Sequence, residues 1–158
     1  MKVYFATDHA GYDMKESLLS YVRDELGHEV EDCGAILFDE YDDYPDFVVV
    51  AAKNVAKDKG SMGIILGASG QGEAVVANRV PGVRAVVYYG EPQRWQIDAC
   101  GEEMDMVMST RKHNDANILS LGARFISIEE AKEVVKKWLS TEFEHEDRHV
   151  RRINKIDT

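Results

Sequence analysis

MGIILGASGQGE, residues Met62–Glu73, runs from an apolar stretch through a glycine-rich turn, and the residues Ala74–Ala77 continue it. This order is typical of a short buried strand, a tight turn and the start of a helix. Such a turn surrounds a concavity with backbone N–H groups, which can bind a phosphate or a developing oxyanion. Glu73 would repel a phosphate in the same turn, but it suits a general base beside an oxyanion hole. The stretch therefore favours proton abstraction over nucleotide binding, and a purely structural connection is the alternative.

Three common glycine-loop motifs do not fit this turn. It has no Gly-Lys-Ser/Thr ending, so it is not a P-loop. The dinucleotide pattern fails because Val75 stands three residues after Gly72, where that pattern requires a third glycine. The serine-nucleophile pattern G-x-S-x-G fails because Gln71 occupies the place of its last glycine.

Short β-rich runs alternate with longer amphipathic stretches outward from this turn. The runs predict strands at residues 3–6, 29–33, 62–66, 83–88 and 118–121. The amphipathic stretches predict helices at residues 12–26, 44–57, 71–79, 128–139 and 145–156, and a mostly helical segment at 92–112 in two pieces around Gly101. Five β–α units in sequence predict an α/β fold, with a parallel sheet between two layers of helices. We expect a single domain that covers residues 1–158.

Composition and charge exclude several classes of protein. The chain has 158 residues, of which 44% are apolar and 30% charged, as in an ordinary globular domain. No apolar run is long enough to span a bilayer, and the N-terminus leads directly into a strand, so we expect a cytoplasmic protein without a membrane partner. Two cysteines, Cys33 and Cys100, give neither a disulfide framework nor a metal spacing. A net charge of −10 argues against nucleic acid as a partner.

Polar residues follow the predicted strands at the edge where ligands bind to parallel sheets. Asp8 and His9 come directly after the first strand, and Tyr88-Tyr89 end the fourth. His9 can contact a ligand there, and Asp8 can accept a hydrogen bond from a sugar hydroxyl. Asp8 can equally cap the helix that follows, and both interpretations stay open.

Two further segments carry candidate ligand contacts. His113–Asn117, with the sequence HNDAN, precedes the fifth strand and suits polyol recognition, although an Asx-type turn is equally compatible. Near the C-terminus, His145–His149 matches H-E-x-x-H, but Arg148 between the two histidines would repel a metal, so we reject a zinc site. Arg148, His149 and Arg152 instead form a contiguous cationic helix surface that fits phosphate binding, with a solvated basic tail as the alternative.

A series of segments occurs in one order along nearly the whole chain. It comprises Asp8–Gly11, Asp43–Asp46, Gly67–Glu73, Ala77–Ala85, His113–Asn117, Leu121–Arg124, Trp138-Leu139, Phe143-Glu144 and Arg148-His149. This series resembles the type B ribose-5-phosphate isomerase family, which includes the galactose-6-phosphate isomerase subunits. The resemblance implies a Rossmann-like three-layer sandwich with a five-stranded parallel sheet and a C-terminal helix. It also implies a homodimer or homotetramer with its site between subunits, no cofactor and no metal.

The implied reaction is aldose–ketose isomerisation of a phosphorylated sugar through an enediolate, with ribose 5-phosphate and ribulose 5-phosphate of the pentose phosphate pathway as the favoured pair. By this resemblance Glu73 is the base that moves a proton between C1 and C2. Many family members use a cysteine at the first loop position, which is Gly67 here, and this chain resembles a branch with the glutamate instead.

The other site residues are also implied by the resemblance. Ser69 and the amides of the loop hold the enediolate oxygens, and the amides are those of Gly70, Gln71, Gly72, Glu73 and Ala74. His113, with Asp8 nearby, assists ring opening. Asn114 and Tyr44 bind sugar hydroxyls. The phosphate is held by His9, Arg124, Arg148 and Arg152, of which some come from the second subunit.

One departure from the family pattern concerns the substrate. The segment between Tyr89 and Lys112 is longer than the family usually has, and it contains Arg94 and Trp95, which are candidates for the pocket mouth. Two alternatives therefore remain beside the favoured pair: isomerisation of another four-, five- or six-carbon aldose phosphate, or a non-catalytic sugar-phosphate-binding subunit.

Overall fold

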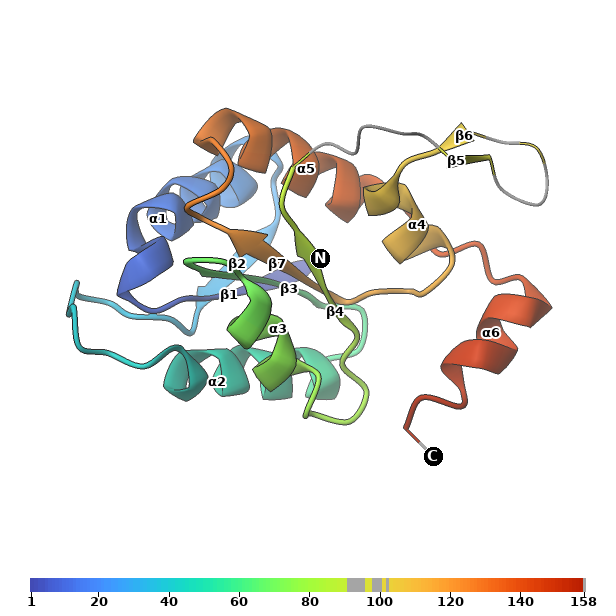
Figure 1. The fold of residues 1–158 in the computed structure, drawn as a ribbon, viewed down its shortest axis with the longest axis horizontal. Helices are drawn as coiled ribbons and strands as arrows, with labels where there is room; N and C mark the ends of the chain where they lie inside the picture. The colour runs from blue at the N-terminus through green and yellow to red at the C-terminus, as the bar shows by residue number, and fades with distance from the viewer. Residues whose placement is uncertain (91–95, 98–100, 102, 158) are drawn as a thin grey trace.

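The computed structural model describes residues 1–90, 96–97, 101 and 103–157. Its main sheet has five parallel strands in the order β2-β1-β3-β7-β4 (Figure 1). They are β1 Lys2–Ala6, β2 Glu29–Asp32, β3 Met62–Gly67, β4 Ala85–Tyr88 and β7 Ile118–Gly122. The predicted five-stranded parallel sheet is confirmed, with strand boundaries within two residues of the prediction.

Helices cover both faces of this sheet, as expected. They are α1 Tyr12–Ser20 with its π-helical continuation Tyr21–Glu25, α2 Tyr44–Lys57, α3 Gln71–Ala77, α4 Met106–Lys112, α5 Ile128–Ser140 and α6 Asp147–Ile153. Side chains alternate between the faces along each strand. Val3 and Phe5 of β1 join the core beneath α1 and α5, and Tyr4 and Ala6 join the core beneath α2. These two cores give the three-layer, Rossmann-like sandwich that the sequence predicts.

The prediction of a mostly helical segment at residues 92–112 holds for Met106–Lys112 (α4) and is wrong for the described residues before that helix. Gln96–Ile97 (β5) and Glu103–Met104 (β6) pair as an antiparallel ribbon, with Gly101 at a φ of 88° between them. Helix α4 begins only at Met106, because the Asp105 carboxylate accepts a hydrogen bond from the Met108 N–H at 2.7 Å and caps the helix there. Arg94, Trp95 and Cys100 lie outside the described residues.

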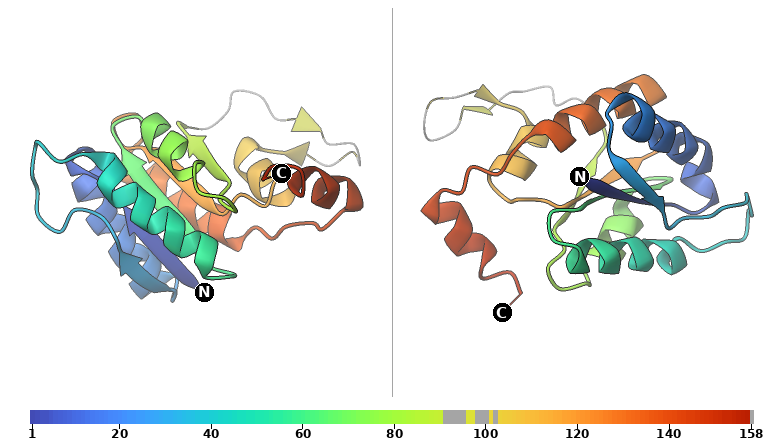
Figure 2. Two further views of the ribbon diagram at one scale, coloured as in Figure 1. Left: turned by 90° about the horizontal axis from the view of Figure 1, so that it is seen from below. Right: turned by 180° about the vertical axis from the view of Figure 1, so that it is seen from behind.

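The last helix is shorter than predicted and stands apart from the sheet. His145 has a φ of 55°, which is outside the helical region, so α6 cannot include it and begins at Asp147. The segment after α5 leads away from the sheet before α6 begins, as both views of Figure 2 show. None of the described helices has the length and apolar character of a membrane span.

Strand order determines where a site can form. From β1 the chain moves to β2 on one side, and β3 then pairs with the other side of β1. The carboxyl ends of β1 and β3 therefore flank a topological switch point, where the loops turn away from each other and leave a crevice. The segments Thr7–His9 and Gly67–Gly70 both begin at this point.

Candidate active site

The glycine loop after β3 is held in shape by the neighbouring strand β7. Gly70 has a φ of 74°, and a β-carbon there would lie 2.9 Å from Ser120 Oγ and 3.0 Å from the Leu121 carbonyl oxygen. The Ser120 hydroxyl, which is fully buried, donates to the Gly70 carbonyl at 2.7 Å. Beyond β7, the Ala123 N–H donates to the Gly67 carbonyl at 2.9 Å. The loop therefore has one well-defined conformation that requires glycine at residue 70.

The backbone amides predicted as oxyanion donors, residues 70–74, differ in the hydrogen bonds that they already make. Gln71 N–H donates to Ser69 Oγ at 3.3 Å, and Ala74 N–H donates to the Gly70 carbonyl at 3.1 Å. The N–H groups of Gly70 and Gly72 have no hydrogen-bond partner among the described residues. Of the predicted oxyanion donors, the N–H groups of Gly70 and Gly72 are thus not engaged by other described residues, and the role of the set, residues 70–74 with the Ser69 hydroxyl, stays a prediction.

Glu73 lies in the first turn of α3 with only 5% of its surface exposed. Burial raises the pKa of its carboxyl group, and the negative charge of Asp8 raises it further, while a hydrogen bond from the backbone of Glu73 itself partly opposes both. A carboxylate that is partly desolvated is a stronger base than one in water. This environment suits the proton abstraction that the sequence predicts for Glu73.

The carboxyl group of Glu73 occupies the space beside the α-carbon of Gly67. A β-carbon at residue 67 would overlap both Oε1 and Cδ of Glu73. The loop therefore has room for a side chain at residue 67 or for the Glu73 carboxyl group, but not for both. This contact gives a steric reason why a glycine at the first loop position accompanies a glutamate at the last.

Asp8 and Tyr44 complete the surroundings of Glu73. Asp8 is 7% exposed, and its carboxylate accepts a hydrogen bond from Ala10 N–H at 2.9 Å. It therefore caps the short helix at His9–Gly11, and its charge also acts on Glu73. Tyr44 reaches the same place from the first turn of α2, because a β-carbon on Gly72 would lie 2.7 Å from its hydroxyl oxygen. Both predicted residues thus lie beside the loop.

His9 is bound to Asp42, a residue that the sequence analysis did not identify. Asp42 Oδ1 lies 2.9 Å from His9 N and 2.7 Å from His9 Nδ1. The pKa of His9 is raised, chiefly by this hydrogen bond and also by the charges of Asp8 and Asp42, whereas burial and the cation of Arg124 lower it. Arg124 therefore lies close enough to act on His9. The acidic run before Tyr44 was the only sequence signal for Asp42.

The other predicted site residues lie at the opposite edge of the sheet. His113 is the C-cap of α4 and precedes the amino end of β7, whereas Glu73 follows the carboxyl end of β3, which runs parallel to β7. The expectation that His113 lies near Asp8 is therefore not met within one chain. Asn114 and Arg152 line a cavity of about 400 Å³ together with His113 and His149. A larger cavity of about 760 Å³, beside Met1, Leu139 and Phe143, contains none of the predicted site residues.

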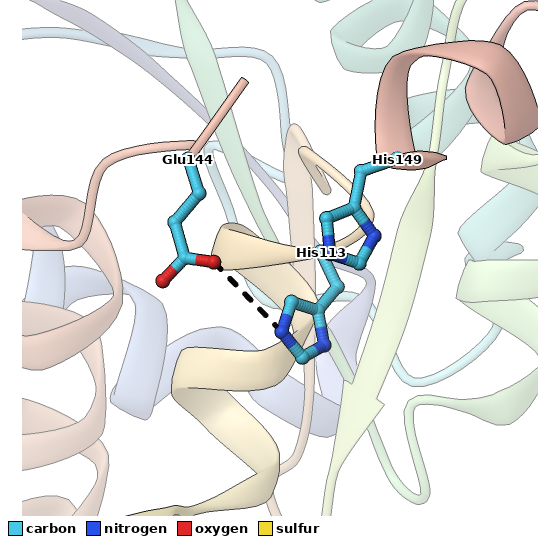
Figure 3. A group of neighbouring side chains, drawn as sticks. All are labelled: His113, Glu144 and His149. Carbon is cyan, nitrogen blue, oxygen red and sulfur yellow. Dashed lines mark ion pairs between the residues drawn. The ribbon is translucent and has the colours of Figure 1, made fainter. Parts of the chain in front are cut away.

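Glu144 and His149 flank His113 at this amino edge (Figure 3). Its ring stacks on that of His149 with centroids 4.4 Å apart and planes 11° from parallel. His113 Nε2 is buried without a hydrogen-bond partner among the described residues, and it lies 3.9 Å from Glu144 Oε2. Burial, the neighbouring His113 and the cation of Arg148 lower the pKa of His149, which favours its neutral form. A neutral stacked ring can support His113 without repelling it.

The two histidines of the H-E-x-x-H match are not arranged as a pair of zinc ligands on one helix. His145 is exposed and precedes α6, whereas His149 is buried within that helix, so the two do not share a helical face. His113, Glu144 and His149 have ligand atoms within 4.8 Å of one another. However, a metal lies in the plane of each imidazole that binds it, and two rings stacked 4.4 Å apart have no common plane.

Comparisons with known proteins agree with this architecture. Residues 3–156 match the Ribose/Galactose Isomerase family. Ribose-5-phosphate isomerase B of Mycobacterium tuberculosis is 37% identical over 154 residues, which are 98% of this chain and 86% of that protein. The Escherichia coli ribose-5-phosphate isomerase B is 34% identical over 155 residues, 98% of this chain and 93% of that protein.

Solved structures of ribose 5-phosphate isomerases have a similar fold over nearly the whole chain. A ribose 5-phosphate isomerase from Thermotoga maritima superimposes with a TM-score of 0.83 at 36% identity, covering 99% of this chain and 97% of its own. Ribose-5-phosphate isomerase B from Mycoplasma genitalium, solved with bound ribulose 5-phosphate, has a TM-score of 0.82 at 32% identity, covering 98% of this chain and 93% of its own.

The overlap at Gly67 leads to the first prediction. Gly67→Ala places a β-carbon where the Glu73 carboxyl group lies, so the carboxyl group must move toward solvent. We expect the pKa of Glu73 to fall toward the ordinary glutamate value, because its burial is lost. A ¹³C NMR titration of the side-chain carboxyl carbons measures this, with Glu73→Gln assigning the signal. An unchanged pKa in a folded Gly67→Ala protein would contradict the steric account.

Proposed function

The chain belongs to the ribose/galactose isomerase family, and we propose that it interconverts ribose 5-phosphate and ribulose 5-phosphate through an enediolate, with Glu73 as the base. The observation that carries this proposal is a buried carboxyl group of raised pKa beside two unpaired glycine amides, at the switch point of the sheet. The curated relatives reported above are named for this reaction, and one related structure holds ribulose 5-phosphate. We place the reaction in the pentose phosphate pathway of the cytoplasm.

In the proposed reaction Glu73 removes the proton from C2 of the open-chain aldose. The electron pair of the broken C–H bond forms the C1–C2 double bond, and the π pair of the C1–O1 carbonyl moves to O1, which gives the enediolate. The proton of the O2 hydroxyl then passes to O1, so that the negative charge moves to O2. The amides of Gly70 and Gly72 and the Ser69 hydroxyl stabilise the negative oxygen. Glu73 then returns its proton to C1 while O2 becomes the ketone oxygen. Because the proton removed at C2 is returned at C1, the reaction needs no oxidant or reductant.

We propose that the complete site forms between two copies of the chain. Each copy has the base and loop at the carboxyl edge of its sheet, and His113, Asn114, Arg148 and Arg152 at the amino edge and on α6. A twofold dimer pairs each carboxyl edge with the other copy's amino edge and so forms two equal sites. Charge supports this pairing, because Asp8, Asp42 and Glu73 lie at one edge and the arginines of α6 at the other.

In such a dimer each group has a defined task. His113 of the second copy transfers the proton between the ring oxygen and O1 that opens the sugar ring. Arg148 and Arg152 of the second copy join His9 and Arg124 around the phosphate, and Asn114 and Tyr44 bind hydroxyls. The phosphate is remote from C1 and C2, so its contacts contribute mainly to substrate binding and orientation.

The central prediction concerns Glu73. Glu73→Gln retains the size and hydrogen bonding of the side chain but removes its basicity. We expect kcat to fall roughly 10²- to 10⁴-fold, with KM little changed, because the loss affects proton transfer alone. Ribose 5-phosphate, a six-carbon aldose phosphate and free ribose are compared by C2 proton exchange, and we expect the first to react fastest.

Two results would count against this function. Retention of more than about a tenth of wild-type kcat in Glu73→Gln would remove Glu73 as the base. Equal rates on ribose and ribose 5-phosphate would show that no phosphate site contributes to catalysis. A faster reaction of the six-carbon aldose phosphate would favour that sugar as the substrate. The double variant Cys33→Ser/Cys100→Ser is the control, and we expect it to remain active because neither cysteine takes the place of the base.

The raised pKa of Glu73 predicts the acid side of the pH profile. Glu73 must be ionised to act as a base, so kcat/KM should fall as the pH falls through its raised pKa, above the ordinary glutamate value. The stability of the folded protein should instead fall as the pH rises, because burial penalises the ionised form of Glu73. Glu73→Gln should therefore raise the Tm at pH 8, where Glu73 is ionised, and change it little at pH 4. Profiles of kcat/KM and thermal melts at both pH values test this; an acid limb in the ordinary glutamate range would contradict it.

Mixing two impaired variants, assayed at a substrate concentration at which each alone is nearly inactive, tests the shared site. Glu73→Gln damages one half of each site, and the double variant Arg148→Ala/Arg152→Ala damages the other half. In a mixed dimer one of the two sites is intact, so random mixing by co-refolding should restore about one quarter of wild-type activity. If mixed dimers form and no activity returns, the two halves do not belong to different copies.

A further inference from the structure

Asp42 accepts two hydrogen bonds from His9, a predicted phosphate ligand of the site. Its Oδ1 accepts from both the backbone N–H and the ring Nδ1 of His9, at 2.9 Å and 2.7 Å. Its side chain is 11% exposed, and Oδ2 is buried without a hydrogen-bond partner among the described residues. Two bonds to one histidine fix both the backbone and the ring of that residue.

The same contact determines which ring nitrogen of His9 faces a ligand. Because the Nδ1–H group donates a hydrogen bond to Asp42, only Nε2 remains for an external partner. In the neutral ring Nε2 is an acceptor, which repels a phosphate oxygen. In the protonated ring it is a donor, which forms a charge-assisted hydrogen bond to that oxygen. His9 therefore attracts a phosphate only while it is protonated.

From these contacts we propose that Asp42 is a positioning residue, which orients His9 and keeps its imidazole protonated so that Nε2 can bind the phosphate of the substrate. The inference rests on the proposed function and extends it to a residue outside the predicted site. The charged groups that act on His9 are Asp42 and Asp8, which favour the protonated ring, and Arg124, which together with burial disfavours it. The raised pKa of His9 shows that the two carboxylates outweigh the opposing effects.

A metal ion is the other ligand that these residues suggest, since Asp8, His9 and Asp42 have ligand atoms within 4.8 Å of one another. The short contact argues against it. Two atoms bound to one metal at about 2.1 Å and at tetrahedral or octahedral angles lie roughly 3.0–3.4 Å apart. His9 Nδ1 and Asp42 Oδ1 are 2.7 Å apart, which is the distance of a direct charge-assisted hydrogen bond.

Asp42 also connects His9 to a segment that is otherwise exposed. Ile36 and Leu37 are 81% and 79% exposed, and Phe38 is 65% exposed although its ring lies edge-on to His9 with centroids 6.2 Å apart. Residues 36–38 thus bury little surface against the rest of the protein. The hydrogen bonds from His9 to Asp42 hold the chain that follows them at the site. Loss of the Asp42 acceptor should therefore loosen the position of His9 as well as its charge.

Two substitutions separate charge from position. Asp42→Asn keeps an oxygen that can accept both hydrogen bonds but removes the negative charge, whereas Asp42→Ala removes both. Glu40→Gln, which removes one negative charge from an exposed residue of the same segment, is the matched control. The readouts are the pKa of His9, from the ring-proton chemical shift, and KM for ribose 5-phosphate between pH 6 and pH 9.

We expect Asp42→Asn to lower the pKa of His9 and to raise KM about tenfold at pH 8 but little at pH 6, with kcat nearly unchanged. Asp42→Ala should raise KM at both pH values, and Glu40→Gln should change neither quantity. Restoration of the wild-type pH dependence by Asp42→Glu would support a charge effect.

The proposal is overturned if Asp42→Asn leaves the pKa of His9 and the pH dependence of KM unchanged, or if Glu40→Gln changes them equally. It is also overturned if Mn²⁺ broadens the His9 signal at micromolar concentration, because the cluster would then be a metal site. If the wild-type protein isomerises no sugar phosphate, the proposed function fails separately. Inorganic phosphate then replaces the substrate, and its effect on the His9 signal in wild-type and Asp42→Asn protein decides whether Asp42 supports anion binding.

Discussion

Thr7 is the point at which the structure around the switch point is held together. It is fully buried at the end of β1, and its hydroxyl donates to the Leu66 carbonyl of β3 at 2.8 Å. Gly11 packs so closely that a β-carbon there would lie 2.5 Å from Thr7 Oγ1, and a β-carbon on Gly34 would lie 2.7 Å from Thr7 N. Only glycines allow the segments of Gly11 and Gly34 to approach Thr7 this closely. Asp8 and His9, the next two residues, are therefore placed with little freedom, and the glycine loop begins directly after Leu66.

This rigid frame explains how a buried carboxyl group is tolerated beside it. Desolvation of Glu73 costs stability when the group is ionised, and its raised pKa reports that cost. Glu73 nevertheless stays buried because Gly67 leaves room for its carboxyl group, and because the hydrogen bonds from Ser120 and Ala123 fix the loop around it. A base whose position is fixed before substrate arrives loses little conformational entropy on binding, which is what proton transfer requires.

Much of the fold was predictable because its signals are local. The run Met62–Gly67 is buried at every position, and Pro45 favours the first turn of α2, which begins and ends at the predicted residues. The composition of residues 92–112 suggested a helix, and among the described residues this holds only from Met106, because β5 pairs with β6 and Asp105 caps α4. Asp42 was not predictable, because its contact with His9 spans 33 residues and depends on the path of the segment after β2. The separation of His113 from Glu73 follows from strand direction, since one precedes a strand and the other follows one.

Strand direction also explains why the predicted phosphate-binding cations of one chain are divided between the two edges of its sheet. A sugar phosphate brings a negative charge of about two units to its site, and the carboxyl edge already holds Asp8, Asp42 and Glu73. His9 and Arg124 are the predicted cations at that edge, and the charge of His9 depends on Asp42. The remaining predicted cations, Arg148 and Arg152, belong to α6, which stands away from the sheet of its own chain (Figure 2). In the proposed dimer α6 of each copy brings these arginines to the acidic edge of the other, so that assembly and substrate binding are favoured by the same electrostatic attraction.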